Sequence, residues 1–358
     1  MEFIVENALK QMREQEVNFE AALAAQANIK VIGVGGAGNN MVDWLYHKGV
    51  KGAKIIACNT DKMQLDSRDA DVKILLGKEL TKGLGAGGFP EVGEQAARES
   101  QQEIKEALRG ADMVWICAGL GGGTGTGASP VIAQIAKELG AIVIGVVTMP
   151  FNIERARIDK AEIGLSKLRQ VCDTVIVIDN NRLVEIAGSL PITQAFAVAN
   201  ELIATMIKGI VETIAIPSLV NLDFADVKAI MKKGGVSVIG VGESSTENRV
   251  QEAVKRALEH PLLDVSYEGA TGALIHITGG EDLTLEEVNK VGELVTANID
   301  PNATVIWGAR IQDDMTGKLR VMTIITGVKS PYILGPVETK RTEEKVGFDE
   351  DLGITVIR

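Results

Sequence analysis

The 358-residue chain lacks several features that would assign it to common classes of protein. It has no apolar run approaching the ~20 residues that cross a bilayer, so we expect no direct membrane insertion. It also lacks a basic excess, because 48 Asp and Glu outnumber 37 Lys and Arg and the net charge is −11. Nucleic-acid phosphates are bound by clustered cations, so this balance argues against nucleic acid as the main partner.

Cysteine and histidine are scarce, with three residues of each. Cys58, Cys117 and Cys172 each lie in or beside an apolar, strand-like run, and the histidines are scattered without metal-ligand spacing. We therefore expect buried reduced thiols and neither a disulfide framework nor a metal site built from protein side chains. The chain begins Met-Glu-Phe without a basic and apolar export signal, which favours a cytoplasmic location.

Glycine, in contrast, is concentrated at one point. Residues 121–127 read Gly-Gly-Gly-Thr-Gly-Thr-Gly, between an apolar run at 113–118 and a helical pattern at 128–139. Such a loop can direct several backbone N–H groups at an anion, beside the positive end of the following helix. The loop contains no lysine, so it is not the P-loop of other nucleotide-binding proteins. The alternative, a simple Gly-rich turn, is disfavoured by five glycines in seven positions.

Two further Gly-rich turns precede it, at 35–38 after the predicted strand 29–34, and at 85–88 after the predicted strand 72–76. Gly33-x-Gly35-x-x-Gly38 satisfies the dinucleotide-binding fingerprint, and Asp61 lies roughly the expected ~20 residues downstream for a ribose-binding acid. An NAD-dependent oxidoreductase is therefore an alternative. Three such turns at successive strand ends favour a triphosphate over a pyrophosphate.

Alternating patterns predict a doubly wound parallel sheet followed by a second, smaller α/β unit. A long helix at 191–214, about 36 Å in length, separates them. Further helices are predicted at 5–25, 41–48, 90–108, 159–169, 246–259 and 284–297, and further strands at 54–58, 141–147, 173–178, 236–241, 273–278, 304–311 and 319–328. We expect the last two strands to form a hairpin and residues 330–347 to be disordered.

The three loops, the long helix and the segment Asn-Leu-Asp-Phe-Ala-Asp at 221–226 together resemble the FtsZ family of tubulin-like cell-division GTPases, and the N-terminal extension and short tail resemble its archaeal members. The resemblance covers residues 29–329. It implies a GTP-binding domain, a long central helix and a second domain. The expected divisions are a helical extension at 1–27, the GTP-binding domain at 28–190, the central helix at 191–217, the C-terminal domain at 218–329, and a linker with a docking peptide at 330–358.

The resemblance also implies site residues. Glu154 is similar to the ribose-binding acid, Asn180 and Asn200 to the residues that bind the guanine edge, and Phe196 to the residue against the base. Arg157 is our candidate for the cation that faces the phosphates, although Glu154-Arg155-Ala156-Arg157 is one residue shorter than the family pattern and lacks its glycine. The other expected GTP-binding residues are Gly35, Gly36, Ala37, Gly38, Asn39, Asn59, Asp61, Gly85, Ala86, Gly87, Gly88, Gly121, Gly122, Gly123, Thr124, Gly125, Thr126 and Gly127.

Asn221, Asp223 and Asp226 are the candidate catalytic residues. If Asn200 touches the base, the rest of the helix carries the chain roughly 20 Å away, so the aspartates are expected to act on the nucleotide of the next subunit. Such a head-to-tail contact builds a filament when it does not close. The alternative is that both aspartates only cap a helix.

From the resemblance we expect GTP or GDP with Mg²⁺ and filaments of the chain itself in the mid-cell division ring. We also expect a membrane-tethering division protein bound to residues 348–358, beginning at Phe348. A second family member sharing the ring is a further expected partner. A GTP-binding scaffold without hydrolysis is the remaining alternative.

Overall fold

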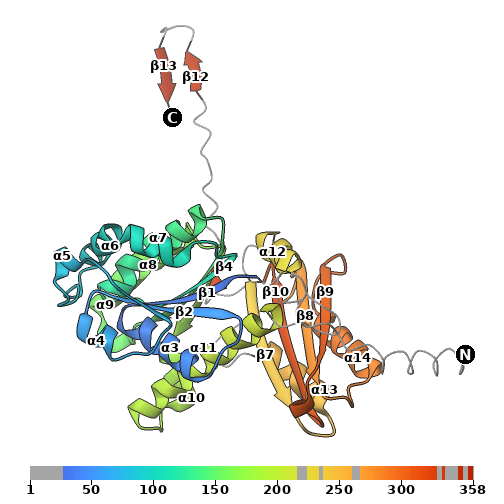
Figure 1. Ribbon diagram of the computed structural model, residues 1–358. Helices are drawn as coiled ribbons and strands as arrows, with labels where there is room; N and C mark the ends of the chain where they lie inside the picture. The colour runs from blue at the N-terminus through green and yellow to red at the C-terminus, as the bar shows by residue number, and fades with distance from the viewer. Residues whose placement is uncertain are drawn as a thin grey trace, which may run out of the picture.

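The computed structural model describes residues 27–215, 224–233, 237–259, 267–328, 333–334, 346–349 and 354–357. The two domains lie side by side, each built around its own sheet (Figure 1). In the first, six parallel strands have the order β6-β5-β4-β1-β2-β3, which confirms the predicted doubly wound sheet. These strands are β1 (Ile29–Val34), β2 (Ala53–Asn59), β3 (Val72–Leu75), β4 (Met113–Gly119), β5 (Ile142–Met149) and β6 (Thr174–Asp179).

Helices cover both faces of this sheet, which is why its central strands are apolar throughout. Successive residues of β1 point to opposite faces of the sheet. Val31 belongs to the core that the sheet shares with α3 (Gly35–His47) and the long helix α11 (Ile192–Ala215). Ile32 belongs to the core on the other face. That second core is covered by α6 (Pro90–Glu99), α7 (Gln101–Leu108), α8 (Thr124–Glu138) and α9 (Ala156–Arg169). The three cysteines are buried as expected, and burial raises the pKa of each thiol.

The helices differ from the sequence prediction mainly where glycines lie. Helices α3 and α8 begin at Gly35 and Thr124, well before the predicted starts at 41 and 128, because the Gly-rich segments form the first helical turns. The predicted helix 90–108 is divided at Ser100 into α6 and α7. Three short helices were not predicted: α4 (Lys62–Asp66), α5 (Lys78–Thr81) and α10 (Asn180–Ala187).

The second sheet has the order β7-β10-β8-β9. Its strands are β7 (Ser237–Ser244), β8 (Gly272–Gly279), β9 (Thr304–Ile311) and β10 (Leu319–Thr326). The predicted hairpin of the last two strands is wrong. Strand β9 pairs in parallel with β8 after the crossover helix α14 (Leu285–Thr296), and β10 inserts antiparallel between β7 and β8. Helix α13 (Arg249–Leu258) packs on β7 and β10, and α12 (Phe224–Lys233) contacts β8 and β10.

Helix α11 connects the domains by packing against both α3 and β7. Among the described residues it alone is long and apolar enough to cross a membrane, with a mean hydropathy of 1.2 over Ile192–Ile214. Three charged residues, Glu201, Lys208 and Glu212, interrupt it, and all three bond to other parts of the chain. Its buried isoleucines belong to the protein core, as expected for the central helix of a folded protein.

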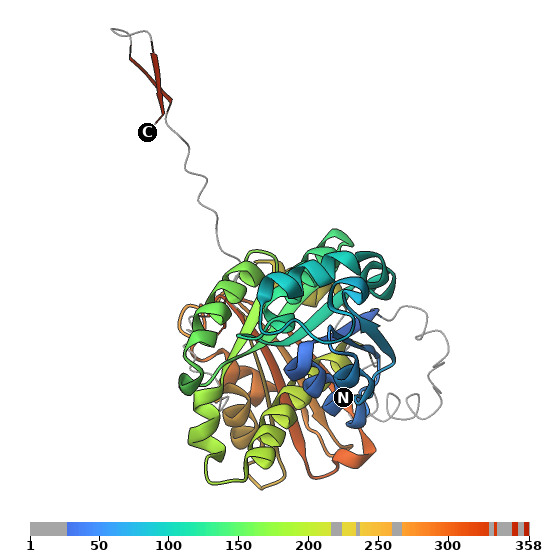
Figure 2. The same cartoon turned by 90° about the vertical axis from the view of Figure 1, so that its left-hand side faces the viewer.

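The C-terminal part contains three short strands. Strand β11 (Ile333–Leu334) pairs antiparallel with β6, so the segment expected to be disordered contributes a seventh strand to the first sheet. Strands β12 (Val346–Asp349) and β13 (Ile354–Ile357) pair with each other and lie apart from both domains (Figures 1 and 2). The predicted N-terminal helix at 5–25 lies outside the described residues.

Candidate nucleotide site

The first turns of α3 and α8 meet at the carboxyl edge of the parallel sheet. A Cβ added to Gly35 would lie 2.9 Å from the backbone nitrogen of Gly125, so the two helix N-termini are in contact. Neither helix has a side-chain cap or an acidic residue in its first turn. The N–H groups at a helix start have no intrahelical partner and carry partial positive charge. Two such ends side by side can bind an anion, which makes this edge the candidate for the anion site expected from the sequence.

The glycines of residues 121–127 have different roles. A Cβ on Gly127 would lie 1.9 Å from the carbonyl oxygen of Pro90, and one on Gly125 would lie 2.4 Å from that of Gly119. These two glycines allow close packing of the backbone. Gly121 has φ +96°, which favours glycine, and Gly122 has no atom within 4 Å of an added Cβ. Gly122 is therefore the member of this loop that faces open space.

The two threonines of the loop already have hydrogen bonds within the protein. Thr126 accepts the backbone N–H of Gly121 at 2.9 Å and is buried, so it closes the loop rather than adding a donor at its rim. The Thr124 hydroxyl lies 2.7 Å from that of Thr60, at the end of β2. Thr60 is fully buried and was not among the expected site residues. The sequence signal for Thr60 as a site residue was its position between Asn59 and Asp61, which were both expected at the site.

Asn39 occupies the first part of α3. It is 1% exposed, and neither its amide nitrogen nor its amide oxygen has a hydrogen-bond partner. A buried amide without hydrogen bonds costs roughly 1–3 kcal/mol of stability. The Asn39 amide is therefore suited to hydrogen bonds with a ligand. An amide beside two uncapped helix ends fits a polar nucleotide.

Asn59 and Asp61 lie at the same edge but serve α4. The Asp61 carboxylate caps this helix by accepting the N–H of Gln64 at 3.0 Å, and Asn59 donates to the Gln64 side chain at 3.4 Å. An added Cβ on Gly36 would lie 2.9 Å from the same Gln64 side chain, which places α4 against the start of α3. Because Asp61 is occupied as a cap, it is poorly placed to bind a ribose in the manner required by the oxidoreductase alternative.

The loop 85–88 is held at this edge by backbone contacts. Gly85 donates to the Thr60 carbonyl at 3.1 Å, and Lys160 of α9 donates to the Gly88 carbonyl at 2.8 Å. Ala86 is buried, and an added Cβ on Gly123 would lie 2.7 Å from its methyl group. The structure thus brings all three Gly-rich segments together.

Glu154 and Arg157 form an ion pair. The carboxylate of Glu154 accepts the N–H of Phe151 at 3.0 Å and a guanidinium N–H of Arg157 at 2.6 Å. The backbone of Arg157 borders Gly121, whose added Cβ would lie 2.9 Å from the Arg157 carbonyl oxygen. Arg155 between them has φ +34°, a conformation that L-residues rarely adopt. Arg155 occupies the position of the glycine in the family pattern, and its backbone has a positive φ, which glycine adopts readily.

The residues expected to bind the base lie on three elements. Phe196 and Asn200 are one turn apart on α11, and Phe196 packs edge-on against Phe151 with ring centres 6.1 Å apart. Helices α3 and α11 run in the same direction. Trp44 of α3 bonds to Glu201 of α11, and Lys51, which follows α3, bonds to Glu212, which is later in α11. The beginning of α11, with Phe196 and Asn200, therefore lies toward the nucleotide end of α3.

Asn180 begins α10, and its neighbour Asn181 makes the hydrogen bonds at this point. The Asn181 amide oxygen accepts the N–H of Asn152 at 3.0 Å, and its amide nitrogen donates to Asp179 at 2.7 Å. Asn181 thereby fixes the loop after β5 to the start of α10. Asn181 was not among the expected site residues, although its place beside Asn180 in the sequence was a signal.

The expected catalytic residues are only partly described. Asn221 and Asp223 lie outside the described residues. Asp226 is a half-buried residue in the first turn of α12. Since α12 packs on the second sheet, and α11 spans about 36 Å before it, Asp226 is separated from the Gly-rich loops of its own chain.

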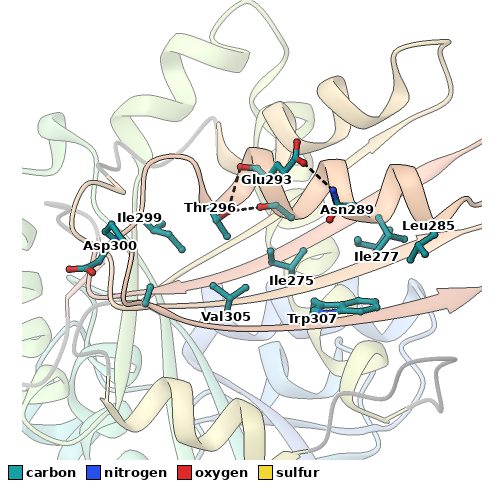
Figure 3. A pocket seen from close by; sticks show the side chains of 14 residues that line it. Ile275, Ile277, Leu285, Asn289, Glu293, Thr296, Ile299, Asp300, Val305 and Trp307 are labelled. Atoms are coloured by element: carbon teal, nitrogen blue, oxygen red, sulfur yellow. Dashed lines mark hydrogen bonds between the residues drawn. The ribbon is translucent and has the colours of Figure 1, made fainter.

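A hollow of about 490 Å³ in the second domain is a less suitable nucleotide site (Figure 3). Ile275, Val305 and Trp307 form its apolar floor under α14, and Glu293 and Asp300 lie at its rim. Two carboxylates and an apolar floor oppose a triphosphate. The Gly-rich edge of the first domain is therefore the candidate nucleotide site.

Comparison with known proteins agrees with this assignment. The model of the Tubulin/FtsZ family, GTPase domain, matches residues 28–188, and that of the FtsZ family, C-terminal domain, matches residues 235–329. Cell division protein FtsZ 2 of Methanocaldococcus jannaschii is 57% identical over 329 residues, which are 91% of this chain and 87% of that protein. Cell division protein FtsZ 1 of Pyrococcus furiosus is 56% identical over 315 residues, which are 88% of this chain and 84% of that protein.

Solved structures show the same fold. An empty FtsZ dimer of M. jannaschii matches with a TM-score of 0.77 and 50% identity, over 90% of this chain and 91% of that one. A GTPγS-bound protofilament of CetZ2 from Haloferax volcanii, at 24% identity and a TM-score of 0.72, covers 85% of this chain and 95% of that one and supports the fold alone. The oxidoreductase alternative has no support from these comparisons. The chain belongs to the FtsZ family of tubulin-like cell-division GTPases.

Proposed function

We propose that the chain binds GTP at the Gly-rich edge of its first sheet, hydrolyses it within head-to-tail filaments, and builds the mid-cell division ring. The observation that carries the GTP site is the pair of uncapped helix N-termini, α3 and α8, beside the unsatisfied amide of Asn39. Phosphates satisfy the N–H groups, and the nucleotide offers Asn39 a partner. Mg²⁺ supplies neutralising charge on the phosphates, held mainly by phosphate oxygens and water.

The binding residues we propose are those expected from the sequence, with Thr60 added through its hydroxyl contact with Thr124. Phe196 and Asn200 contact the base together with Asn180, and Glu154 contacts the ribose. The Arg157 guanidinium donates to the Glu154 carboxylate at 2.6 Å, and we propose that Arg157 faces the phosphates from this position.

We further propose that Asn221, Asp223 and Asp226 complete the site of the neighbouring subunit. Asp226 lies beyond the far end of α11, so a filament with α12 of one subunit over the Gly-rich edge of the next would bring the acid and nucleotide together. There the carboxylates orient and polarise the water that attacks the γ-phosphate. Hydrolysis then requires assembly.

The test begins with GTP hydrolysis per subunit as protein concentration is raised, with light scattering recorded in the same samples. Activity should appear together with scattering above a threshold concentration. Asp226→Ala should keep GTP binding and lose turnover. Turnover that is independent of concentration, or unchanged in Asp226→Ala, would contradict the shared site.

A mixing experiment separates the two halves of the site. Gly122→Asp adds a carboxylate to the open position of the loop and should abolish GTP binding, whereas Gly122→Ala has room and should retain it. A 1:1 mixture of Gly122→Asp and Asp226→Ala should regain activity, because about one quarter of random interfaces combine an intact loop with an intact acid. Copolymers that sediment but do not hydrolyse GTP would place the acid in its own subunit's site.

The terminal hairpin of β12 and β13 is proposed as the docking element for a membrane-tethering division protein. It lies apart from both domains and offers strand edges to a partner (Figures 1 and 2). Truncation after residue 345 should leave GTP turnover unchanged and abolish recruitment to the membrane. A truncated protein that still localises to the ring would refute this role. A second family member in the ring is a further proposed partner.

A further inference from the structure

Away from the nucleotide edge, three metal-ligating side chains converge at the far end of α3. Asp43 and His47 are one helical turn apart on α3, and Asp69 comes from the loop between α4 and β3. One ligand atom from each lies within 4.8 Å of the other two. Helices α3 and α4 are in contact, and the side chains of His47 and Asp69 are exposed.

The spacing of these atoms is that of ligands around one ion. The Nε2 atom of His47 lies 3.6 Å from Asp43 Oδ1 and 3.3 Å from Asp69 Oδ2. Ligands bound at ~2.0–2.2 Å to a tetrahedral ion are about 3.3–3.6 Å apart. We propose that Asp43, His47 and Asp69 bind one transition-metal ion of the Zn²⁺ class, with water as the fourth ligand.

The chemistry of the three groups favours this class of metal. An imidazole nitrogen with two carboxylates suits Zn²⁺ or Co²⁺, whereas Ca²⁺ and Mg²⁺ are bound almost entirely by oxygen. Both aspartates present an oxygen to the same ring nitrogen of His47, so one ion at that point can be bound by all three groups.

The backbone also fixes the ligands. The N–H of Asp69 donates to Asp43 Oδ1 at 2.7 Å, which joins the α4–β3 loop to α3. The other oxygen of Asp43 lies 3.7 Å from a guanidinium nitrogen of Arg68. The hydrogen bond from Asp69 to Asp43 fixes the two carboxylates relative to each other. The positive charge of Arg68 opposes metal binding.

This site is separate from the nucleotide. Asp43 lies eight residues beyond Gly35, about 12 Å along α3. Helix α3, which supplies Asp43 and His47, begins at the nucleotide edge at Gly35, and α4, which precedes the loop with Asp69, begins there at its cap Asp61. A bound metal would therefore join the far ends of two elements whose first residues form the candidate nucleotide site.

The experiment titrates the full-length, nucleotide-free protein with Co²⁺ in excess Mg²⁺ and follows its visible absorption, with Zn²⁺ as the competitor. We expect one equivalent of Co²⁺ with a four-coordinate spectrum, displaced by Zn²⁺. His47→Ala and Asp69→Asn should each weaken binding by about tenfold or more. Arg68→Ala should strengthen it, because a competing positive charge is removed.

Asp66→Asn is the matched control, since it removes the same charge from an exposed residue three positions away that is not among the three ligands. It should leave the Co²⁺ affinity nearly unchanged. The proposal is overturned if no Co²⁺ binds in the presence of Mg²⁺. It is also overturned if Asp66→Asn and Asp69→Asn weaken binding equally, because that would indicate general surface charge without a defined site.

Discussion

Glu201 of α11 accepts the indole N–H of Trp44 of α3 at 2.8 Å, and the same carboxylate pairs with Lys48. Thr205, one turn further along α11, accepts a second bond from Lys48 at 2.8 Å. These contacts attach the central helix to the helix whose first turn forms part of the candidate nucleotide site. They link the position of α11 to that site.

Glu201→Gln should lower the free energy of unfolding by less than about 1 kcal/mol at neutral pH, because the pair is partly exposed. Partial burial alone would raise the pKa of Glu201, but the bonds from Lys48 and Trp44 hold it below its usual value of 4.5. The added stability is therefore present above about pH 4.5 and is lost as pH falls through the lowered pKa. Denaturant unfolding at several pH values measures the difference, with Glu106→Gln as an exposed control.

Thr60→Val should weaken GTP binding several-fold, because it removes the hydroxyl that orients Thr124 at 2.7 Å. A matched control is Thr174→Val on β6. Thr174 is equally buried, but its hydroxyl has no hydrogen-bond partner, so this change should preserve or raise stability. Calorimetric titration with GTP measures the first effect and thermal unfolding the second. Equal GTP affinity in Thr60→Val and the unmodified protein would remove Thr60 from the site.

Asn39→Leu should separate stability from binding. The Asn39 amide is buried without a hydrogen-bond partner within the protein, so an apolar side chain of similar size should raise the melting temperature measured without nucleotide. The same change should weaken GTP binding about tenfold, since one hydrogen-bonding group is lost. Parallel melting curves with and without GTP test both effects. A variant that is less stable without nucleotide, yet binds GTP normally, would assign the amide a structural role.

Arg155→Gly should leave the protein as stable or make it more stable, because it relieves a positive φ that costs of order 1–3 kcal/mol. Arg98→Gly, in the last turn of α6, provides the contrast and should cost up to about 1 kcal/mol. Thermal unfolding of the two variants gives the comparison. Equal destabilisation would mean that the Arg155 side chain contributes more than its backbone strain costs.

The six parallel strands of the first domain could be predicted closely, since β1 has the predicted bounds and the others differ by at most two residues at either end. Their sequences are apolar because both faces are covered, and that signal is local. The starts of α3 and α8 were less predictable. Glycine disfavours helix on its own, yet Gly38 and Gly127 are helical because only glycine allows the adjacent backbone to approach so closely.

The wrong hairpin has a different cause. Strands β9 and β10 are separated by a short connection that is typical of a hairpin, but pairing partners depend on distant segments. Among the site residues, glycines and acids could be found from motifs. Thr60 and Asn181 stand beside expected residues in the sequence, but their roles come from contacts across the fold with Thr124 and Asn152, which no motif shows.

The inserted strand β10 also sets the order in which the protein can form during synthesis. All six parallel strands of the first sheet and its covering helices, which end with α11 at Ala215, precede the second sheet in the chain, so that domain can fold before β11 adds the seventh strand. The second sheet is different, because β10 lies between β7 and β8 and is the last of its four strands to be made. A growing chain can thus carry a folded first domain before the second domain, which contains Asp226, has a complete sheet. Filament assembly is therefore delayed until synthesis is nearly finished.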